Sequence, residues 1–355
     1  MGMLKLAILP GDGIGVEVTK QALRVLEKVK EVYGVEYSCS EGLIGGKAID
    51  ETGSPFPQQT KDLVKQCDAV LLGAVGGPKW EKAGSVRPEK GLLEIRKYLQ
   101  LYANLRPIKC WKYLIDQSPF KNEKVEGVDL LIVRELTGGA YFGSRGTEIK
   151  DNIERAFDTI EYNEKEIRRL VKIAFDLAGQ RRKKITSVDK ANVLDTSRLW
   201  RKIVEEEATG YSEISLNHMY VDNCAMQICS NPAQFDVIVT ENMFGDILSD
   251  QASVLGASLG MLPSASIGEG PALYEPAHGS APDIAGQDKA NPLATILSVA
   301  MMLRISFKLF DAAKAIEKAV DIVLKRGLRT ADIWLPRDTC VGTCAMGDAV
   351  LREIV

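Results

Sequence analysis

The sequence has 355 residues, 45% of them hydrophobic and 26% charged, which is the composition of a folded globular protein. The formal net charge is −3 and no basic block or tail occurs, which argues against nucleic acid and membrane surfaces as partners. No apolar run reaches the ~20 residues that a membrane-spanning helix needs. The first residues resemble a strand rather than a signal peptide, so we expect a cytoplasmic protein.

The cysteines and histidines limit the metal chemistry. Seven cysteines are present and none forms a C-x-x-C pair, so we expect reduced and mostly buried thiols. His218 and His278 are the only histidines, which excludes a histidine-rich zinc site. Any bound metal is therefore expected to be a hard cation held by carboxylates.

Short apolar runs alternate with helical patterns along the chain. A first strand is predicted over 4–9, followed by a helix over 15–33 in which apolar residues recur at helical spacing and which Gly34 ends. Further strands are predicted over 69–75, 130–133, 185–188 and 237–239. None of these runs alternates with polar residues, which favours a parallel sheet covered by helices on both faces and an α/β fold.

The turn after the first strand contains half of a dinucleotide-binding fingerprint, Gly11, Gly13 and Gly15. The third glycine of the full pattern is missing, because Glu17 and Val18 stand there. A tight strand-to-helix turn explains the glycines equally well. We therefore assign no cofactor to this loop.

Three arginines form a candidate receptor for carboxylates. Arg96 lies on a helical stretch, Arg106 precedes a proline, and Arg134 directly follows the apolar run LLIV. Converging guanidinium groups bind carboxylates through several planar contacts that lysine does not reproduce. For any one of these arginines alone, a salt bridge at a strand end is the alternative.

Two aspartates form a candidate metal site in the segment ENMFGDILSDQAS. Asp246 and Asp250 are four residues apart and share one face of the predicted helix. A divalent cation would relieve their repulsion, and Mg²⁺ commonly takes one or two carboxylates. The strand FDVIVT leads into this helix, which places the aspartates near a strand's carboxyl end, where α/β proteins bind ligands. Solvated surface acids are the alternative.

A candidate base occurs in the segment VDKANVLDTSRLW. Lys190 follows the predicted strand ITSV and precedes a helix that carries Arg198 and Trp200. Like charge and desolvation beside a metal and arginines would lower the pKa of this lysine and allow it to act as a base. A surface lysine near a helix start is the alternative.

Together these segments resemble the isocitrate/isopropylmalate dehydrogenase family over nearly the whole chain. The matching segments are LAILPGDGIG, GAVGGPKW, GLLEIRK, NLRP, RELTGGAYFG, VDKANVLDTSRLWR, YVDNCAMQ, TENMFGDILSD, LGMLPSAS and EPAHGSAPDIAGQDKANP. The resemblance implies an α/β fold with two lobes that share a mixed, largely parallel sheet sandwiched by helices. It places an NAD-binding lobe at 1–101 and 257–355, and a lobe for dimerisation, metal and catalysis at 102–256.

The resemblance implies a metal-dependent and NAD-dependent oxidative decarboxylation of a 2-hydroxy dicarboxylate. Leu92 and Leu93 precede Arg96 by about one helical turn, where the family faces the variable group of its substrate. Because burying a third carboxylate against leucines is costly, we expect (2R,3S)-3-isopropylmalate, converted to 4-methyl-2-oxopentanoate in leucine biosynthesis. D-malate, tartrate and homoisocitrate remain alternatives. A catalytically silent relative that only binds a partner is a further one, although the family's catalytic residues are all present.

Site residues also follow from the resemblance. The implied catalytic residues are Lys190, Tyr141 and Asp222. The implied substrate-binding residues are Arg96, Arg106, Arg134, Asp222, Leu92, Leu93, Asn192 and Val193. The implied ligands of Mg²⁺ or Mn²⁺ are Asp222, Asp246 and Asp250. In the family Lys190 and Asp222 come from the partner subunit, so we expect a homodimer with shared active sites.

For NAD, the resemblance implies contacts with Gly76, Gly77, Glu89, His278, Gly279, Ser280, Ala281, Asp283, Ile284 and Asn291. A carboxylate at Asp283 accepts hydrogen bonds from ribose hydroxyls and repels a 2′-phosphate, so NAD is expected rather than NADP. Two residues depart from the family pattern: Cys224 stands where alanine is expected, and Gln251 where glutamate is. Because Cys224 lies near Asp222, we expect sensitivity to thiol reagents.

Overall fold

The computed structural model describes residues 3–81 and 86–355, which form two compact units. Unit 1 contains the described residues of 1–101 together with 110–119 and 256–355, and unit 2 contains 102–109 and 120–255. The chain therefore passes between the units more than once. Residues 110–119, which the sequence placed in the second lobe, belong to unit 1.

Unit 1 is built on five strands in the order β2-β1-β3-β12-β11. Their bounds are β1 Leu4–Gly11, β2 Tyr37–Glu41, β3 Ala69–Ala74, β11 Pro263–Gly268 and β12 Ala272–Pro276. β1 is parallel to β2 and β3, β3 is parallel to β12, and β11 is antiparallel to β12. The carboxyl ends of β1, β3 and β12 therefore lie at the same edge of the sheet.

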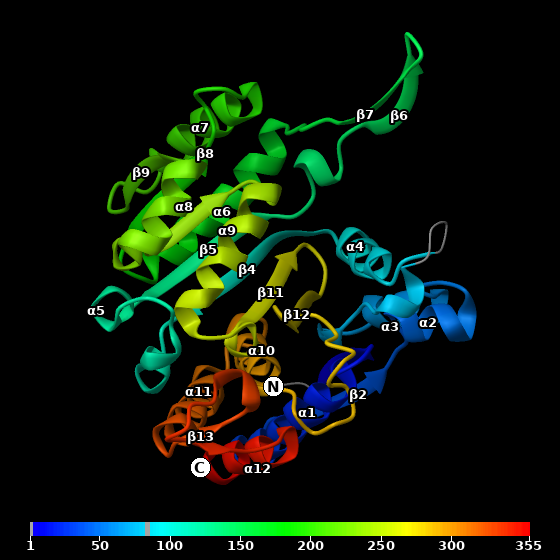
Figure 1. Cartoon of the computed structure of the whole chain (residues 1–355), viewed down its shortest axis with the longest axis vertical. Helices are drawn as coiled ribbons and strands as arrows, with labels where there is room; N and C mark the ends of the chain where they lie inside the picture. The colour runs from blue at the N-terminus through cyan, green and yellow to red at the C-terminus, as the bar shows by residue number, and fades with distance from the viewer. Residues whose placement is uncertain (1–2, 82–85) are drawn as a thin grey trace. The chain divides into compact units, whose positions relative to one another are not determined.

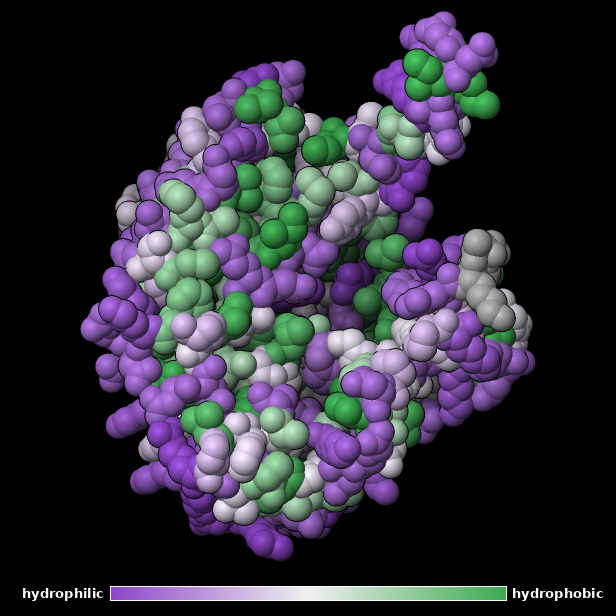
Figure 2. All heavy atoms as spheres, viewed as in Figure 1, coloured by the Kyte–Doolittle hydropathy of each residue, from purple (hydrophilic) through white to green (hydrophobic). Residues whose placement is uncertain are grey.

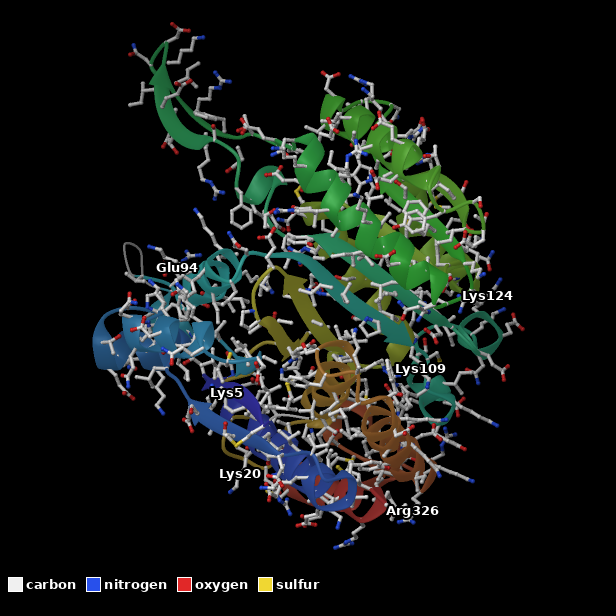
Figure 3. All side chains as sticks on the ribbon, turned by 180° about the vertical axis from the view of Figure 1, so that it is seen from behind. Lys5, Lys20, Glu94, Lys109, Lys124 and Arg326 are labelled. Atoms are coloured by element: carbon white, nitrogen blue, oxygen red, sulfur yellow. The ribbon has the colours of Figure 1, made fainter. Side chains whose placement is uncertain are left out.

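The helices of unit 1 cover these strands (Figure 1). They are α1 Gly15–Tyr33, α2 Gly45–Thr52, α3 Gln58–Lys65, α4 Glu89–Tyr98, α10 Leu293–Ile305, α11 Phe310–Lys325 and α12 Thr343–Glu353, with a small ladder of β13 Leu328–Arg329 and β14 Thr339–Cys340. α10 is apolar on nearly all sides and packs against α1, α11, β11 and β12, so it forms the centre of the core. Charged side chains such as Lys20 on α1 are exposed (Figure 3).

Unit 2 is built on five strands in the order β4-β5-β10-β8-β9. Their bounds are β4 Leu101–Lys109, β5 Asp129–Glu135, β8 Lys184–Asp189, β9 Ser215–Tyr220 and β10 Val237–Thr240. β5, β10, β8 and β9 are parallel neighbours, whereas β4 is antiparallel to β5. Four parallel carboxyl ends therefore share one edge of the sheet, and this edge carries the candidate site.

The helices of unit 2 are α5 Asn122–Val125, α6 Glu164–Gly179, α7 Asp195–Ala208, α8 Val221–Ser230 and α9 Asn242–Ser253. α6 packs on β5, β8 and β10, α9 packs on β5, and α8 packs on β9 and α9. A hairpin of β6 Arg145–Lys150 and β7 Ile153–Asp158 extends away from these helices (Figure 1). Its apolar side chains are exposed, among them Ile149 at 79% and Ile153 at 69% (Figure 2).

The α/β fold class is confirmed, and the mixed sheet replaces the all-parallel sheet that the apolar runs alone suggest. None of the seven cysteines, all of which the structure describes, forms a disulfide, as expected, but only Cys67, Cys110 and Cys224 are buried, so the prediction of mostly buried thiols is wrong. In the described part of the chain, no helix has both the length and the apolar character needed to cross a bilayer.

The turn between β1 and α1 needs its glycines for backbone packing. Gly11 has a φ of +71°, and a Cβ there would lie 1.9 Å from the carbonyl oxygen of Ala74. A Cβ at Gly13, with a φ of +54°, would lie 2.0 Å from the carbonyl oxygen of Ser280. The glycines therefore allow the end of β1 and the following turn to lie against the last residue of β3 and the segment after β12, which supports the tight-turn interpretation of this sequence.

We predict that Gly11→Ala destabilises the protein far more than Gly34→Ala. Gly34 also has a positive φ, +66°, but a Cβ there meets no atom within 4 Å. The control should cost about 1 kcal/mol, the strain of the left-handed conformation, and Gly11→Ala at least about 3 kcal/mol because of the added overlap. Thermal unfolding of both variants measures the difference, and equal losses would contradict the packing explanation.

Candidate active site

The candidate site in unit 2 is assembled at the carboxyl ends of parallel strands. Arg134 is near the end of β5, Lys190 follows β8, Asp222 follows β9, and Asn242 begins α9 just after β10. These strands are parallel neighbours, so their ends reach the same edge of the sheet. Open α/β sheets place their ligands at such an edge.

Arg134 is a buried cation with several fixed contacts. Its side chain is 5% exposed, and Nη1 donates to a carboxylate oxygen of Asp246. Nε and Nη2 both donate to Oδ1 of Asn242, at 3.1 and 2.8 Å. Gly245 allows α9 to approach, because a Cβ there would lie 2.6 Å from Cγ of Arg134. Arg134 is thus an oriented guanidinium, as a carboxylate receptor requires.

Arg106 approaches the same helix from β4. Its side chain is 13% exposed, Nη1 donates to Asp250 at 2.8 Å and to Oγ of Ser249 at 2.7 Å, and Nη2 lies 3.6 Å from Asp246. Nε donates to Oδ1 of Asn104, a fully buried residue, at 3.1 Å. The structure therefore brings Arg106 and Arg134 together over the two aspartates, as the carboxylate-receptor hypothesis requires.

The two aspartates of α9 suit a hard divalent cation. Asp246 and Asp250 lie one helical turn apart, and their side chains are 34% and 65% exposed. Two carboxylates that leave the remaining positions to water and substrate are a donor set that Mg²⁺ commonly uses. Among the described residues, no group of three or more His, Cys, Asp or Glu side chains lies close enough to hold a metal. Asp222 thus does not join Asp246 and Asp250 within one chain.

Tyr141 lies against the same carboxylate. It ends a short turn, Gly139–Tyr141, and its hydroxyl donates to Oδ2 of Asp246 at 3.0 Å. The guanidinium of Arg134 lies 5.8 Å from the centroid of the ring. Burial raises the pKa of Tyr141 above its usual value of 10, and the charge of Asp246 raises it further. Because a raised pKa extends the protonated form to higher pH, the phenol retains a proton that it can donate.

Lys190 and Asp222 form an ion pair at the carboxyl ends of β8 and β9. Nζ of Lys190 donates to Oδ2 of Asp222 at 2.8 Å, and this hydrogen bond is the main reason why the pKa of Asp222 is lowered. The backbone N–H of Lys190 donates to Oγ of Ser197, which fixes the turn. Asn192 and Val193 follow in this turn and are exposed, Val193 at 61%.

The remaining substrate-binding candidates lie in unit 1. Arg96 of α4 is 12% exposed, and Nη2 donates to Glu275 of β12 at 2.8 Å. Leu93 is 42% exposed, whereas Leu92 packs against the core under α4. Leu92 is only partly buried, so both leucines present apolar surface on α4, and Leu93 presents more of it.

The residues expected to bind NAD also gather in unit 1. A Cβ at Gly76 would lie 2.9 Å from Oε1 of Glu89 and 3.7 Å from Oγ of Ser280. A hollow of about 310 Å³ is lined by Gly77, Trp80, Glu81, Arg87, Pro88 and Glu89. Ala281 and Ile284 pack on the apolar cluster at the start of α1. The carboxyl ends of β3 and β12 thus bring Gly76, Glu89 and Ser280 to one place.

The segment after β12 presents groups suited to an adenosine ribose. Asp283 is exposed, and a Cβ at Gly279 would meet no atom within 4 Å, so the backbone there is open to a ligand. Nδ1 of His278 lies 2.9 Å from the carbonyl oxygen of Gly279, and burial lowers the pKa of this histidine. Asn291 instead has contacts within the fold: Oδ1 accepts from the backbone N–H of Leu293 at 3.0 Å, and Nδ2 donates to Asp332 at 3.0 Å.

The two departures from the family pattern have structural roles in α8 and α9. Nε2 of Gln251 donates to the carbonyl oxygen of Ala225 at 2.6 Å and to Sγ of Cys229 at 3.1 Å, which ties α9 to α8. Cys224 is 0% exposed, and burial raises the pKa of its thiol to about 12. A buried thiol that keeps its proton is a poor nucleophile, so the structure argues against the expectation that Cys224 confers sensitivity to thiol reagents.

Several residues of the site were not predicted from the sequence. Asn104, Asn242 and Ser249 hold Arg106 and Arg134, and Glu275 pairs with Arg96. Asn242 directly follows the run FDVIVTE, so the strand-end argument that singled out Arg134 also applies to it. Asn104 lies two residues before Arg106 on β4, a spacing that places both side chains on one face of the strand and could have indicated the pair. Glu275 carries no comparable local signal, because its partner Arg96 is 179 positions away.

We predict that iodoacetamide at pH 8 alkylates Cys340 and leaves Cys224 unmodified in the folded protein. Cys340 is exposed, whereas Cys224 is buried and its thiol has a pKa of about 12, so the reactive thiolate is scarce and inaccessible. Peptide mass spectrometry after a timed reaction measures both sites, with the denatured protein as the control in which both react. Equal labelling of the two cysteines in the folded protein would contradict the prediction.

Comparisons with known proteins identify the family of this chain. The family model described as isocitrate/isopropylmalate dehydrogenase matches residues 5–350. The 3-isopropylmalate dehydrogenase of Aquifex aeolicus is 57% identical over 356 residues, covering 100% of this chain and 98% of the relative. That of Geobacillus kaustophilus is 60% identical over 358 residues, covering 100% of this chain and 96% of the relative. The crystal structure of isocitrate dehydrogenase from Methylococcus capsulatus matches with a TM-score of 0.88 and 36% identity, covering 99% of both chains. The chain therefore belongs to the isocitrate/isopropylmalate dehydrogenase family.

Proposed function

We propose that this protein oxidises and decarboxylates (2R,3S)-3-isopropylmalate with NAD, giving 4-methyl-2-oxopentanoate in leucine biosynthesis. The observation that carries the proposal is the pairing of two nearly buried arginines, Arg106 and Arg134, with two aspartates one helical turn apart. This arrangement suits an anionic substrate bound beside a divalent cation. The full-length relatives described above bear the name of this enzyme.

The arginines bind and orient the substrate. Arg106 and Arg134 have fixed guanidinium planes, so a carboxylate that replaces water at them loses little side-chain freedom. Arg96 is the third arginine proposed to bind the substrate, and its Nη2 donates to Glu275. When bound, a divalent cation on Asp246, Asp250 and the Asp222 of a second copy would stabilise negative charge on the substrate oxygens, and NAD would accept the hydride.

Two side chains move protons. In its neutral form, Lys190 accepts the proton of the substrate hydroxyl and becomes an ammonium group, which Asp222 at 2.8 Å stabilises as its hydrogen-bond acceptor. Tyr141 donates a proton to carbon after carbon dioxide has left. The raised pKa of Tyr141 suits an acid, because the phenol is neutral throughout the physiological range.

We propose a homodimer in which a second copy supplies Lys190 and Asp222 to the site built on Arg134 and Asp246. Exposed apolar side chains on α8 and α9 support such an interface, Met226 at 61% and Ile247 at 58%. Figure 2 shows hydrophobic side chains over the part of unit 2 where these helices lie. Scattered exposed apolar residues are ordinary, but a patch across two packed helices indicates an interaction surface.

We propose that unit 1 binds NAD and that unit 2 supplies the dimer contact. The residues proposed around the cofactor are Gly76, Gly77, Glu89, His278, Gly279, Ser280, Ala281, Asp283, Ile284 and Asn291. The exposed carboxylate of Asp283 favours NAD, because it would repel the 2′-phosphate of NADP. Leu93 gives the substrate's variable group an apolar neighbour. The free cysteines accord with the reducing cytoplasm, which we propose as its location.

We predict that NADH formation requires both a divalent cation and 3-isopropylmalate. Addition of EDTA should lower the rate at least about 100-fold, and Mg²⁺ or Mn²⁺ should restore it.

The kcat/KM for 3-isopropylmalate should exceed that for isocitrate by at least about 100-fold, because an extra carboxylate would be desolvated against leucine. Homoisocitrate, D-malate and tartrate complete the comparison, and NADP replaces NAD in a parallel series. Higher kcat/KM on another acid would change the substrate, and absence of turnover on all of them would indicate a silent relative.

We predict that Tyr141→Phe slows decarboxylation more than oxidation. The substitution removes only the hydroxyl that donates to Asp246, so hydride transfer proceeds while the protonation step loses about 100-fold or more. Rapid mixing should show a burst of NADH, about one per active site, followed by slow turnover. Normal steady-state turnover in Tyr141→Phe would assign the proton donation to another group.

A further inference from the structure

One buried amide, that of Asn242, connects two parts of the candidate site that lie on different elements. Asn242 is 1% exposed and begins α9. Its Oδ1 accepts from Nε and Nη2 of Arg134, at 3.1 and 2.8 Å. Its Nδ2 donates to the carbonyl oxygen of Gly138 at 3.0 Å. Since arginine only donates and a carbonyl only accepts, these partners allow one orientation of the amide.

The contact with Arg134 fixes the direction of its remaining donor. Nε and Nη2 are on one edge of the guanidinium plane, and both are held by the same oxygen of Asn242. Nη1 is consequently directed at Asp246, the residue that also accepts from Tyr141. Because the guanidinium is planar and rigid, holding one edge sets the position of the whole group.

The contact with Gly138 fixes the start of the turn that carries Tyr141. Gly139 follows with a φ of +75°, and a Cβ there would lie 2.4 Å from the hydroxyl of Tyr162. The backbone N–H of Gly139 donates to the carbonyl oxygen of Glu161 at 2.9 Å. The turn then places the hydroxyl of Tyr141 3.0 Å from Asp246. Anchoring the Gly138 carbonyl therefore limits where the phenol lies.

The backbone of Asn242 is itself held firmly. Its N–H donates to the hydroxyl of Tyr162 at 3.0 Å, and that hydroxyl donates to Oε2 of Glu241 at 3.1 Å. Oε1 of Glu241 accepts from the N–H of Phe244 at 2.8 Å and caps α9. Asn242 therefore lies at a helix N-terminus that several hydrogen bonds hold in place, as a residue that positions its neighbours requires.

We propose that Asn242 is a positioning residue that aligns Arg134 with a substrate carboxylate and Tyr141 with the carbon that it protonates; this inference rests on the proposed function. One amide then serves both substrate binding and the final proton transfer. Its removal affects KM through Arg134 and kcat through Tyr141, and each effect depends on the presence of its own partner.

Two double-mutant cycles test this dependence. Asn242→Ala alone should raise the KM for 3-isopropylmalate about 10-fold and lower kcat about 10-fold. In an Arg134→Lys background, the same substitution should change KM less than about 2-fold, and in a Tyr141→Phe background it should change kcat less than about 2-fold. A purely structural role for Asn242 predicts the same factors in every background.

Asp236→Asn is the matched control. Asp236 is also 1% exposed in unit 2, but it precedes the other end of β10 and accepts from Nε of Arg181 at 2.8 Å. This substitution should lower the midpoint of thermal unfolding and leave KM and kcat within about 2-fold in all three backgrounds.

Asn242→Asp keeps the test decisive if Asn242→Ala does not fold. The carboxylate retains the acceptor for Arg134 and removes the donor to Gly138, so kcat should fall about 10-fold while KM stays within about 3-fold. Equal factors for Asn242→Ala in all backgrounds, or a KM increase as large as the kcat loss in Asn242→Asp, would overturn the inference. Failure of the wild-type protein to turn over 3-isopropylmalate would instead overturn the proposed function.

Discussion

The balance of charge on one face of α9 is the constraint on which the site depends. Asp246 and Asp250 repel each other, and the guanidinium groups of Arg106 and Arg134 lie against them. Burying an unpaired arginine costs free energy, and so does placing two carboxylates close together. The ion pairs between the arginines and the aspartates offset both costs. The same opposed charges suit a divalent cation and an anionic substrate, since the cation offsets the aspartates and the substrate carboxylate offsets the arginines.

Much of the scaffold could be predicted because its elements are strongly patterned. The helix predicted over 15–33 is observed as Gly15–Tyr33, since its apolar spacing is regular and Gly34 ends it in the left-handed conformation. The predicted strands are observed as β1, β3, β5, β8 and β10. β2 was missed because its sequence, YSCSE, is polar and mostly exposed at a sheet edge. β4 and β11 were not among the predicted strands, so their antiparallel pairing was missed as well. The apolar runs could not have shown it, because an apolar strand has the same pattern in either direction.

The charged residues of the candidate site could be predicted from the sequence, but the residues that orient them through hydrogen bonds and ion pairs were not. Arg134, Lys190 and Asp246 are conspicuous because each is charged and lies beside a strand end. Asn104 contacts Arg106 from the same strand, and Glu275 contacts Arg96 across 179 positions of sequence. The pairing of Glu275 with Arg96 depends on tertiary structure, whereas the contact between Asn104 and Arg106 is local to β4 and was overlooked. The burial of Cys224 is a further example, since proximity to Asp222 in sequence suggested reactivity that the packing removes.

The crystal structure of the protein with Mn²⁺ and 3-isopropylmalate tests the account most directly, because the anomalous signal of manganese locates the cation. We expect Mn²⁺ on the carboxylates of Asp246 and Asp250, with Arg106 and Arg134 bound to a carboxylate of the substrate. A cation bound elsewhere, with both arginines still directed only at the aspartates and the substrate in another place, would contradict the central claim.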